Sequence, residues 1–357
     1  MEPNSTHPAT ASDLAVPQHG LSRKARMLRA LRREAVDRLP TQSNYTRAMG
    51  RLLSGHFAIA EAELPERLGN HLVRVDIDYR RPTNADGSTE FDWWGAGWDT
   101  RTEGYWHAFS PLKDSLDLDR YPWPDPNDPA ILRTAEQTIR RRGGDYFVAP
   151  NLGMCLFERA WSLRGFDALL MDMVERTDWV EELLDRITEI QLSVSRRFVA
   201  AGVAGGYFGD DYGAQRAMLF SPRLWRRLIK PRLAKLFAVF VDAGLPVILH
   251  SDGDIRAILP DLVEIGLTTL NPVQPEVLEH AWLQKEYGAK LSFYGGVSTQ
   301  GVLPGGTVEK VRAATLACAR ALAPEGTGLV LGASHRMQSD IPPRNVEAML
   351  DAFDQIH

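Results

Sequence analysis

The sequence has 357 residues, 44% of them hydrophobic, and a formal net charge of −5 at pH 7. This length allows one large domain or two ordinary ones, and the composition allows a substantial core. The negative charge, together with the lack of a basic tract between aromatic residues, argues against binding of nucleic acid. No apolar run approaches the roughly 20 residues that cross a membrane, so we expect no membrane partner either.

The cysteine content and the N-terminal residues indicate the cellular setting. Cys155 and Cys318 are the only cysteines, and no Cys-x-x-Cys spacing occurs. A disulfide framework is therefore not expected, and a cytoplasmic location suits this composition. Residues 1–20 are rich in Pro, Ser, Thr and Ala and lack the apolar core of a signal peptide. We expect a disordered tail, followed by one domain over residues 21–357.

Segments typical of helices and strands alternate from residue 22 onward. Ser22 is a good N-cap for an amphipathic helix that reaches about residue 37 and forms an N-terminal helical extension. Residues 39–44 predict a first strand. The β-branched run 72–77 predicts a second strand, which ends at Asp78.

Residues 79–128 form an aromatic-rich insert in which both patterns lapse. Trp93, Trp94 and Trp98 lie in it, and so does the run Tyr-Pro-Trp-Pro-Asp-Pro that begins at Tyr121. A stretch of this length inside a compact domain is usually functional or carries small strands of its own. The aromatic side chains could wall a pocket, form an oligomer interface such as that of a homodimer, or make a small satellite core.

Six further strands are predicted after the insert, each separated from the next by a helical segment. They are residues 146–150, 205–209, 247–250, 268–272, 291–295 and 328–332. Eight short strands that alternate with helices predict a single (β/α)8 TIM barrel. The alternative is a doubly wound open sheet, but no Gly-x-Gly-x-x-Gly follows the first strand.

In a barrel, the polar residues that follow the strands meet at one rim. That rim would collect Asp78, Asn151, Asp210, Asp211, His250, Asp252, Asn271, Gln274, Ser298, Gln300, Ser334 and His335. Within this set, a buried strand breaks at residues 250–254 into His-Ser-Asp-Gly-Asp. An α/β enzyme would be expected to place chemistry at such a strand end. In the simpler interpretation, this segment only caps the next helix.

Six motifs in order resemble the uroporphyrinogen decarboxylase superfamily. They are Gly209-Asp-Asp-Tyr-Gly213, Ser221-Pro222, His250-Ser-Asp-Gly253, Asn271-Pro-Val-Gln274, Gly295-Gly-Val-Ser-Thr-Gln300 and Ser334-His335. The resemblance covers about residues 22–357 and implies a (β/α)8 barrel, in agreement with the strand count. It also implies one of two activities: decarboxylation in haem synthesis, or methyl transfer between a corrinoid (cobalamin) protein and an acceptor such as a thiol or a folate.

Two departures from the superfamily pattern disfavour decarboxylation of a porphyrinogen. The decarboxylases place an aspartate at the end of the second strand, and Asp78 occupies the matching point without the surrounding Phe-Ser-Asp pattern. They carry a tyrosine on the helix after the third strand, where this chain has Trp161. Because the Trp-rich insert is also more similar to the methyltransferase-like branch, the resemblance places the chain nearer to that branch.

The thiol-activating methyltransferases of this superfamily bind zinc through His-x-Cys after the fifth strand and a further cysteine after the eighth. This sequence keeps His250, but has Asp252 and His335 where those relatives have cysteines. The resemblance therefore implies a Zn²⁺ site at these three residues. Such a set keeps an open fourth position and suits an oxygen ligand better than a thiol. Without a metal, the three residues would hydrogen-bond a substrate or one another.

Carboxylates and amides complete the candidate site. Without a metal, acid–base chemistry falls to Asp210, Asp211 and Asp78, because two close carboxylates can raise one pKa and give a general acid near neutral pH. Such an acid could protonate a carbanion after decarboxylation, or a pterin nitrogen during methyl transfer. The substrate-binding candidates are Asn151, Asn271, Gln274, Gln300 and Trp161. Each amide could instead make only a loop hydrogen bond.

Three hypotheses about function follow. The first is an enzyme that transfers a methyl group between a corrinoid protein and a small acceptor such as tetrahydrofolate, a thiol or a methoxylated compound. The second is a decarboxylase that acts on a uroporphyrinogen-like or other acidic substrate. The third is a non-catalytic barrel that binds a small ligand.

Overall fold

The computed structural model describes residues 20–104 and 106–356. The predicted disordered tail over residues 1–20 lies outside the described residues, except for Gly20. No helix among the described residues has the length and apolar character that would let it cross a membrane.

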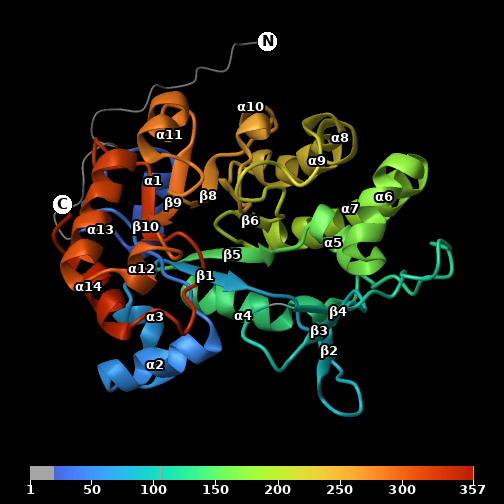
Figure 1. Cartoon of the computed structure of the whole chain (residues 1–357), viewed down its shortest axis with the longest axis horizontal. Coiled ribbons are helices and arrows are strands. Elements are labelled where there is room, and N and C mark those ends of the chain that lie inside the picture. Colours follow the sequence, from blue (N-terminus) through green and yellow to red (C-terminus); the bar gives the residue numbers. More distant parts are fainter. Residues whose placement is uncertain (1–19, 105, 357) are drawn as a thin grey trace, which may run out of the picture.

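A curled sheet of seven parallel strands forms the centre of the molecule, in the order β1-β5-β6-β7-β8-β9-β10 (Figure 1). The strands are β1 (Leu72–Val75), β5 (Phe147–Leu152), β6 (Gly206–Gly209), β7 (Val247–His250), β8 (Thr269–Val273), β9 (Ser292–Val297) and β10 (Leu329–Ala333). Consecutive strands pair in parallel along the whole order, as the alternation of strands and helices predicts. The fold is therefore TIM-barrel-like.

The predicted first strand, over residues 39–44, is absent as a regular strand. Thr41 instead makes isolated parallel bridges to Asn70, next to β1, and to Leu331 in β10, so this segment links the two edges of the sheet. The Gln42 side chain accepts hydrogen bonds from two backbone N–H groups at the start of β1, and the Asn70 side chain accepts one from Ser43. Side-chain amides thus supplement the few backbone bonds that this segment makes to Leu331 and His71, and the prediction of eight regular strands was wrong by this one.

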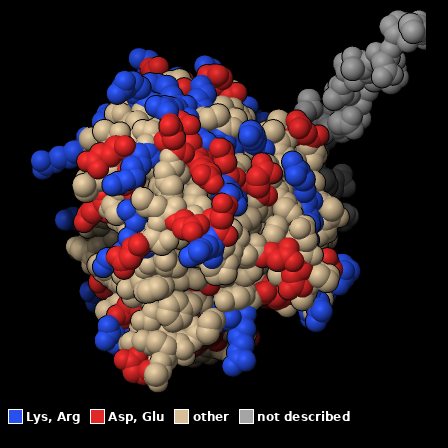
Figure 2. All heavy atoms as spheres, turned by 90° about the vertical axis from the view of Figure 1, so that its right-hand side faces the viewer, with Lys and Arg blue, Asp and Glu red and all other residues tan. Residues whose placement is uncertain are grey.

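Helices lie around the sheet (Figure 1). They are α1 (Arg23–Leu31), α2 (Arg47–Phe57), α3 (Leu64–Arg67), α4 (Arg133–Arg142), α5 (Phe157–Arg164), α6 (Phe166–Glu175), α7 (Thr177–Ala201), α8 (Pro222–Leu228), α9 (Lys230–Val241), α10 (Leu259–Glu264), α11 (His280–Tyr287), α12 (Val302–Gly305), α13 (Val308–Leu322) and α14 (Pro343–Phe353). On the face that carries α6, basic and acidic side chains are interspersed (Figure 2).

Helix α1 packs against residues that point into the barrel. Ser22 caps it as predicted, accepting a hydrogen bond from the Ala25 N–H. Met27 and Leu31 are buried in one cluster with Phe147, Tyr294 and other strand residues. Each such buried side chain stabilises the fold by about 1.5–3 kcal/mol. The helix ends at Leu31 and not near residue 37, because the chain turns at once through a left-handed residue at position 33.

The aromatic insert folds into a small antiparallel sheet, in the order β2-β3-β4 (Figure 1). Its strands are β2 (Thr89–Phe91), β3 (Gly97–Asp99) and β4 (Trp106–Phe109). The expectation that so long a stretch carries small strands of its own is confirmed. The sheet lies beyond the carboxyl end of β1, where it supplies one wall of the cavity described below.

Candidate active site and metal centre

A cavity of about 610 Å³ lies between the carboxyl ends of the barrel strands and the insert. Its floor comes from the strands and includes Tyr207, Asn271 and Tyr294, while its outer wall comes from the insert and α5. The size is in the range of cavities that hold small-molecule ligands. Packed side chains and α1 close the floor of the cavity. The cavity therefore lies at the carboxyl ends of the strands, where enzymes of this fold carry their sites.

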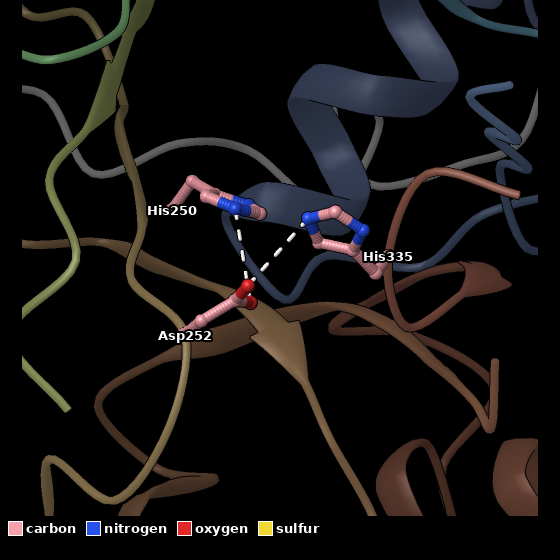
Figure 3. A group of neighbouring side chains, drawn as sticks. All are labelled: His250, Asp252 and His335. Atoms are coloured by element: carbon pink, nitrogen blue, oxygen red, sulfur yellow. Dashed lines mark ion pairs between the residues drawn. The ribbon is translucent and has the colours of Figure 1, made fainter. Parts of the chain in front are cut away.

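His250, Asp252 and His335 converge beside this cavity, as Figure 3 shows. His250 is the last residue of β7, and His335 follows β10 by two residues. The His250 Nε2 lies 3.8 Å from Asp252 Oδ1, and the His335 Nε2 lies 3.5 Å from Asp252 Oδ2. Residues that are 85 positions apart in the sequence therefore meet at one point, as the resemblance implied.

The turn after β7 places Asp252 in this group. Gly253 has a φ of +80°, and a Cβ at this residue would lie 2.3 Å from the Gly213 carbonyl carbon. Only glycine allows both the left-handed conformation and this close approach. The Gly253 N–H donates to the Gln274 Oε1 at 2.8 Å, and the Asp252 N–H donates to the Asp211 Oδ1 at 2.8 Å. The loop that carries Asp252 is thus held on both sides.

Asn271 fixes the orientation and tautomer of His250. The Asn271 amide nitrogen donates to the Tyr294 carbonyl at 3.1 Å, and its Oδ1 accepts from the Tyr207 hydroxyl at 2.9 Å. The oxygen must therefore be the atom that lies 2.8 Å from the His250 Nδ1, and this nitrogen must carry the proton. The His250 Nε2 then presents its lone pair toward Asp252, which is the form that binds a metal.

The three residues fit a divalent metal by their chemistry and by one unpaired atom. All three ligand atoms lie within 4.8 Å of one another. Asp252 Oδ1 is buried and has no hydrogen-bond partner within the described part of the chain. An unpaired buried carboxylate oxygen is costly unless a cation or a donor meets it. Burial lowers the pKa of His335, although the negative charge of Asp252 acts in the other direction. The lowered pKa favours the neutral imidazole that a metal requires.

The predicted carboxylate pair divides between two roles. Asp210 is fully buried and does not line the cavity. Its carboxylate accepts hydrogen bonds from the N–H groups of Leu156, Phe157 and Glu158 and from the Tyr212 hydroxyl, so it caps the start of α5. Burial raises the pKa of Asp210 to about 6. This geometry gives Asp210 a structural role and leaves Asp211 as the member of the pair that lines the cavity.

Glu158 is a cavity-lining carboxylate that the sequence did not single out. Burial, followed by the charges of Asp211 and Asp210, raises the pKa of Glu158 well above its usual value. Burial and the nearby Asp252 also raise the pKa of Asp211. An acidic residue in the first turn of a helix is common for reasons of helix stability alone, so the sequence held no distinctive signal for Glu158.

The predicted catalytic Asp78 lies outside the cavity lining. Strand β1 ends at Val75 and not at residue 77, and Asp76 is the carboxylate that faces the cavity. Asp78 instead accepts a hydrogen bond from the Thr134 N–H, in the first turn of α4. The placement of Asp78 on the rim was therefore wrong by two residues.

Some of the predicted substrate-binding residues line the cavity and others do not. Asn151, Asn271 and Trp161 line the cavity, and Asn151 donates to the Asp76 Oδ1 at 2.7 Å. Gln274 and Gln300 do not line it. Gln274 supports the turn beneath Asp252, as described above, and Gln300 is exposed.

The outer wall of the cavity is built from indole rings. They belong to Trp93, Trp94, Trp98, Trp106 and Trp161. The Trp98 and Trp161 rings meet edge to face, with centroids 6.1 Å apart. Among the proposed roles for the insert, the geometry supports the cavity wall, and Trp94 also packs into the buried core.

One buried ion pair joins this wall to the barrel. The Arg159 guanidinium lies 2.6 Å from Asp92 Oδ2 and packs over the Trp94 ring. Asp92 also accepts hydrogen bonds from the Trp94 N–H and from the Trp98 indole N–H. A single carboxylate therefore organises two of the indoles and connects them to α5.

Fold and site together define a TIM-barrel-like protein with a cavity and a candidate metal centre at the carboxyl ends of its strands. The sequence matches the family model described as uroporphyrinogen decarboxylase (URO-D) over residues 109–356. The chain belongs to this family, as the motifs predicted.

Solved structures agree on the fold. A methyltransferase from Methanosarcina mazei superposes with a TM-score of 0.68 at 22% identity, covering 94% of this chain and 99% of that one. A B12-independent methionine synthase from Shewanella sp. W3-18-1 superposes with a TM-score of 0.51 at 11% identity, covering 89% of this chain and 96% of that one. At these identities the likeness shows the fold alone. A comparison with curated protein sequences gives no significant match.

Proposed function

We propose that this member of the URO-D family transfers a methyl group between a corrinoid carried by a partner protein and a small molecule, which accepts the methyl group if it is a folate or a thiol and donates it if it is a methoxylated compound. The observation that carries the proposal is the convergence of His250, Asp252 and His335 beside the cavity. The names of the two structural neighbours, a methyltransferase and a methionine synthase, support methyl transfer.

Zn²⁺ is a metal that suits two imidazoles and one carboxylate, and it is the one that we propose here. When bound, it supplies a Lewis acid that lowers the pKa of the group it holds and stabilises negative charge there. His250 and His335 would bind through their Nε2 atoms, and Asp252 through the oxygen that has no other partner. Asn271 keeps the His250 ring in the orientation that this requires.

Glu158 is the residue best suited to hold a proton at this site. It lines the cavity beside Asp211, and burial and the neighbouring carboxylates raise its pKa well above its usual value, which favours the protonated form. A neutral carboxylic acid can donate its proton to an atom that gains an electron pair during methyl transfer. Asp211 raises this pKa through its charge and holds the Asp252 loop through its side-chain oxygen.

The proposal is tested by following the absorption spectrum of methylcob(III)alamin with purified enzyme, Zn²⁺ and candidate acceptors. We expect demethylation of methylcob(III)alamin with a thiol or a folate, or methylation of cob(I)alamin by a methoxylated compound, and a loss of about 100-fold or more in His335→Ala, because a metal ligand is removed. His56→Ala is the matched control, since His56 pairs with Glu347 away from the cavity. Absence of demethylation and of the reverse methylation of cob(I)alamin with thiols, folates and methoxylated compounds would refute methyl transfer.

Decarboxylation is the second candidate, and one observation favours it. Asp76 lines the cavity at the end of β1, and Asn151 holds its carboxylate. If the enzyme releases CO₂ from a porphyrinogen or another acidic substrate, Asp76→Asn should abolish the release and Asp78→Asn should not. Equal loss in both variants would argue against a role for the cavity carboxylate.

A further inference from the structure

We infer that the corrinoid-carrying partner binds an apolar surface beside the cavity, formed by β4, the chain that follows it and α6, and that it meets the acidic insert with a basic surface of its own. The inference rests on the proposed function and adds the place and the charge of the contact. We call this area the docking surface. Its members are Trp106, Phe109, Leu116, Phe166, Met171 and Val174.

Exposed apolar side chains are concentrated in this part of the molecule. Within the residues that the structure describes, nine large hydrophobic side chains are exposed, and six of them fall between residues 106 and 174. Isolated exposed apolar side chains are normal on a protein surface, but a group of them in one area usually marks a site where another molecule binds.

The segments that carry these side chains lie next to one another. The Trp161 ring contacts both the His107 ring on β4, with centroids 5.2 Å apart, and the Phe166 ring on α6, at 6.0 Å. The Arg164 guanidinium donates to the Leu112 carbonyl at 2.9 Å, which holds the chain after β4 against α5. The exposed members therefore belong to one continuous region and not to separate parts of the surface.

Helix α6 turns an apolar side away from the protein. Leu169 and Met173 are buried on one side of this helix. Phe166, Met171 and Val174 lie on the other side, where they are exposed. A surface helix normally buries its apolar residues and exposes polar ones, so this side of α6 is suited to contact with a partner.

Trp106 connects the docking surface to the cavity. Its indole lines the cavity and is also 62% exposed. Helix α6 and the insert lie on the same side of the molecule (Figure 1). A protein that carries a corrinoid is far too large for a cavity of about 610 Å³, so it must cover the open side of the cavity to bring cobalt to the methyl group. The docking surface adjoins that open side.

The charge of the insert indicates the chemistry of the partner. Residues 79–128 contain ten of the 46 acidic side chains and five of the 41 basic ones, so they account for the whole net charge of −5. A hollow beside the insert continues this acidic area. It is lined by Trp123, Ile190 and Arg186 and by five acidic residues of α7: Asp178, Glu181, Glu182, Asp185 and Glu189.

This charge favours a basic partner over a second copy of the chain. A symmetric contact between two copies would bring the same surface of each chain together, and the two acidic inserts would repel each other. A basic surface on the corrinoid protein would instead be attracted to the insert and guided toward the cavity.

Substitution of Val174 gives the first test. The probe is the methylcobalamin-loaded corrinoid protein of the source cells, purified by its cobalamin absorption and identified by its sequence. Val174→Asp should weaken binding of this probe by about tenfold or more in biolayer interferometry, because a charge would enter an apolar contact. Val241→Asp is the matched control, since Val241 is an exposed valine at the end of α9. Both variants should turn over free methylcobalamin at the wild-type rate, which shows that the fold and the cavity are intact.

Ionic strength gives the second test. Association of the wild type with the same probe should slow by about tenfold or more between about 20 mM and about 200 mM salt, because salt screens the attraction. Asp114→Lys should slow association at low salt as well, since Asp114 is an exposed acidic residue two positions from Leu116.

Equal binding of the probe by wild type and Val174→Asp, or association that salt does not slow, would overturn the inference and leave the proposed function standing. Sedimentation of the wild type as a dimer that Val174→Asp dissociates would also overturn it, because a second copy would then cover the docking surface. Absence of methyl transfer to or from both free and protein-bound corrinoid would refute the proposed function, and this inference with it.

Discussion

Asn271 is the residue on which the geometry of the candidate metal centre most depends. Its amide nitrogen donates to the Tyr294 carbonyl, and its one amide oxygen accepts from both the Tyr207 hydroxyl and the His250 Nδ1. The side chain is 5% exposed, so water does not readily replace it. It is a positioning residue, since it acts on the metal through His250.

Asn271→Ala should therefore weaken zinc binding by about 10–100-fold, the usual effect of removing a hydrogen-bond partner of a metal-binding histidine. Competition with a chromophoric chelator measures this affinity directly. Gln300→Ala is a fitting comparison, because Gln300 is an exposed amide that does not line the cavity. Equal zinc affinity in wild type and Asn271→Ala would show that the ring is held by other means.

For the individual residues of the candidate site, the sequence predicted the types of side chain better than the positions that carry them. His250, Asp252 and His335 meet as the motifs implied. The carboxylate at the end of β1 was displaced by two residues, because a β-branched run does not mark where the last ladder hydrogen bond forms. The side chains of Asp210 and Asp211 lie in different surroundings, and the sequence alone cannot tell which of the two faces the cavity.

Helix α5 and the insert act together as one wall of the site. Asp92 connects them through the buried pair with Arg159 and through its bonds to Trp94 and Trp98. The side chains of Asp92 and Arg159 are 14% and 7% exposed, so neither charge is well solvated without the other.

Asp92→Ala should destabilise the wall by about 3 kcal/mol, because the Arg159 charge would remain buried and unpaired. Hydrogen exchange of the amides in β2, β3 and β4 should become faster, while exchange in β7 and β8 should not change. Asp119→Ala removes an exposed partner of Arg186 and should leave both regions unchanged. Unaltered exchange in Asp92→Ala would show that the insert is held mainly by its apolar packing.

The strands with a regular sequence pattern were predicted well. The way in which residues 39–44 join the two edges of the sheet was not. The parallel strands from β5 to β10 follow the order in the chain. Residues 39–44 look like a strand, but Pro40 offers no N–H, and Gln42 and Asn70 accept backbone bonds through their side chains. Such substitutions depend on distant partners, so local sequence does not reveal them.

For the molecule as a whole, the end of the barrel opposite the cavity is closed by α1 and a polar cluster. The Arg26 guanidinium pairs with Asp37 and lies 2.9 Å from the His71 Nε2. The His71 Nδ1 lies 2.7 Å from the Gly69 carbonyl, so it carries the proton, and Nε2 accepts from Arg26. Burial, with a smaller effect of the Arg26 charge, lowers the pKa of His71 to about 4.

Stability should therefore fall as the pH drops from about 6.5 to about 4, because the unfolded state binds a proton at His71 that the folded state resists. The shift from 6.5 to about 4 corresponds to a loss on the order of 3 kcal/mol below this window. The free energy of unfolding in guanidinium chloride can be measured at pH 7 and pH 5 for wild type and for His71→Gln. The difference between the two proteins in their pH dependence is the contribution of His71. The same pH dependence in both would exclude His71 as its source.

The central claim is that His250, Asp252 and His335 bind one metal ion at the mouth of the barrel. Elemental analysis of the purified protein, after zinc loading and removal of excess metal, tests this most directly. About one zinc per chain is expected in wild type and in His56→Ala, and almost none in His250→Ala, provided that all three proteins unfold at similar temperatures. Zinc that remains in His250→Ala, or that is absent from all three proteins, would contradict the claim.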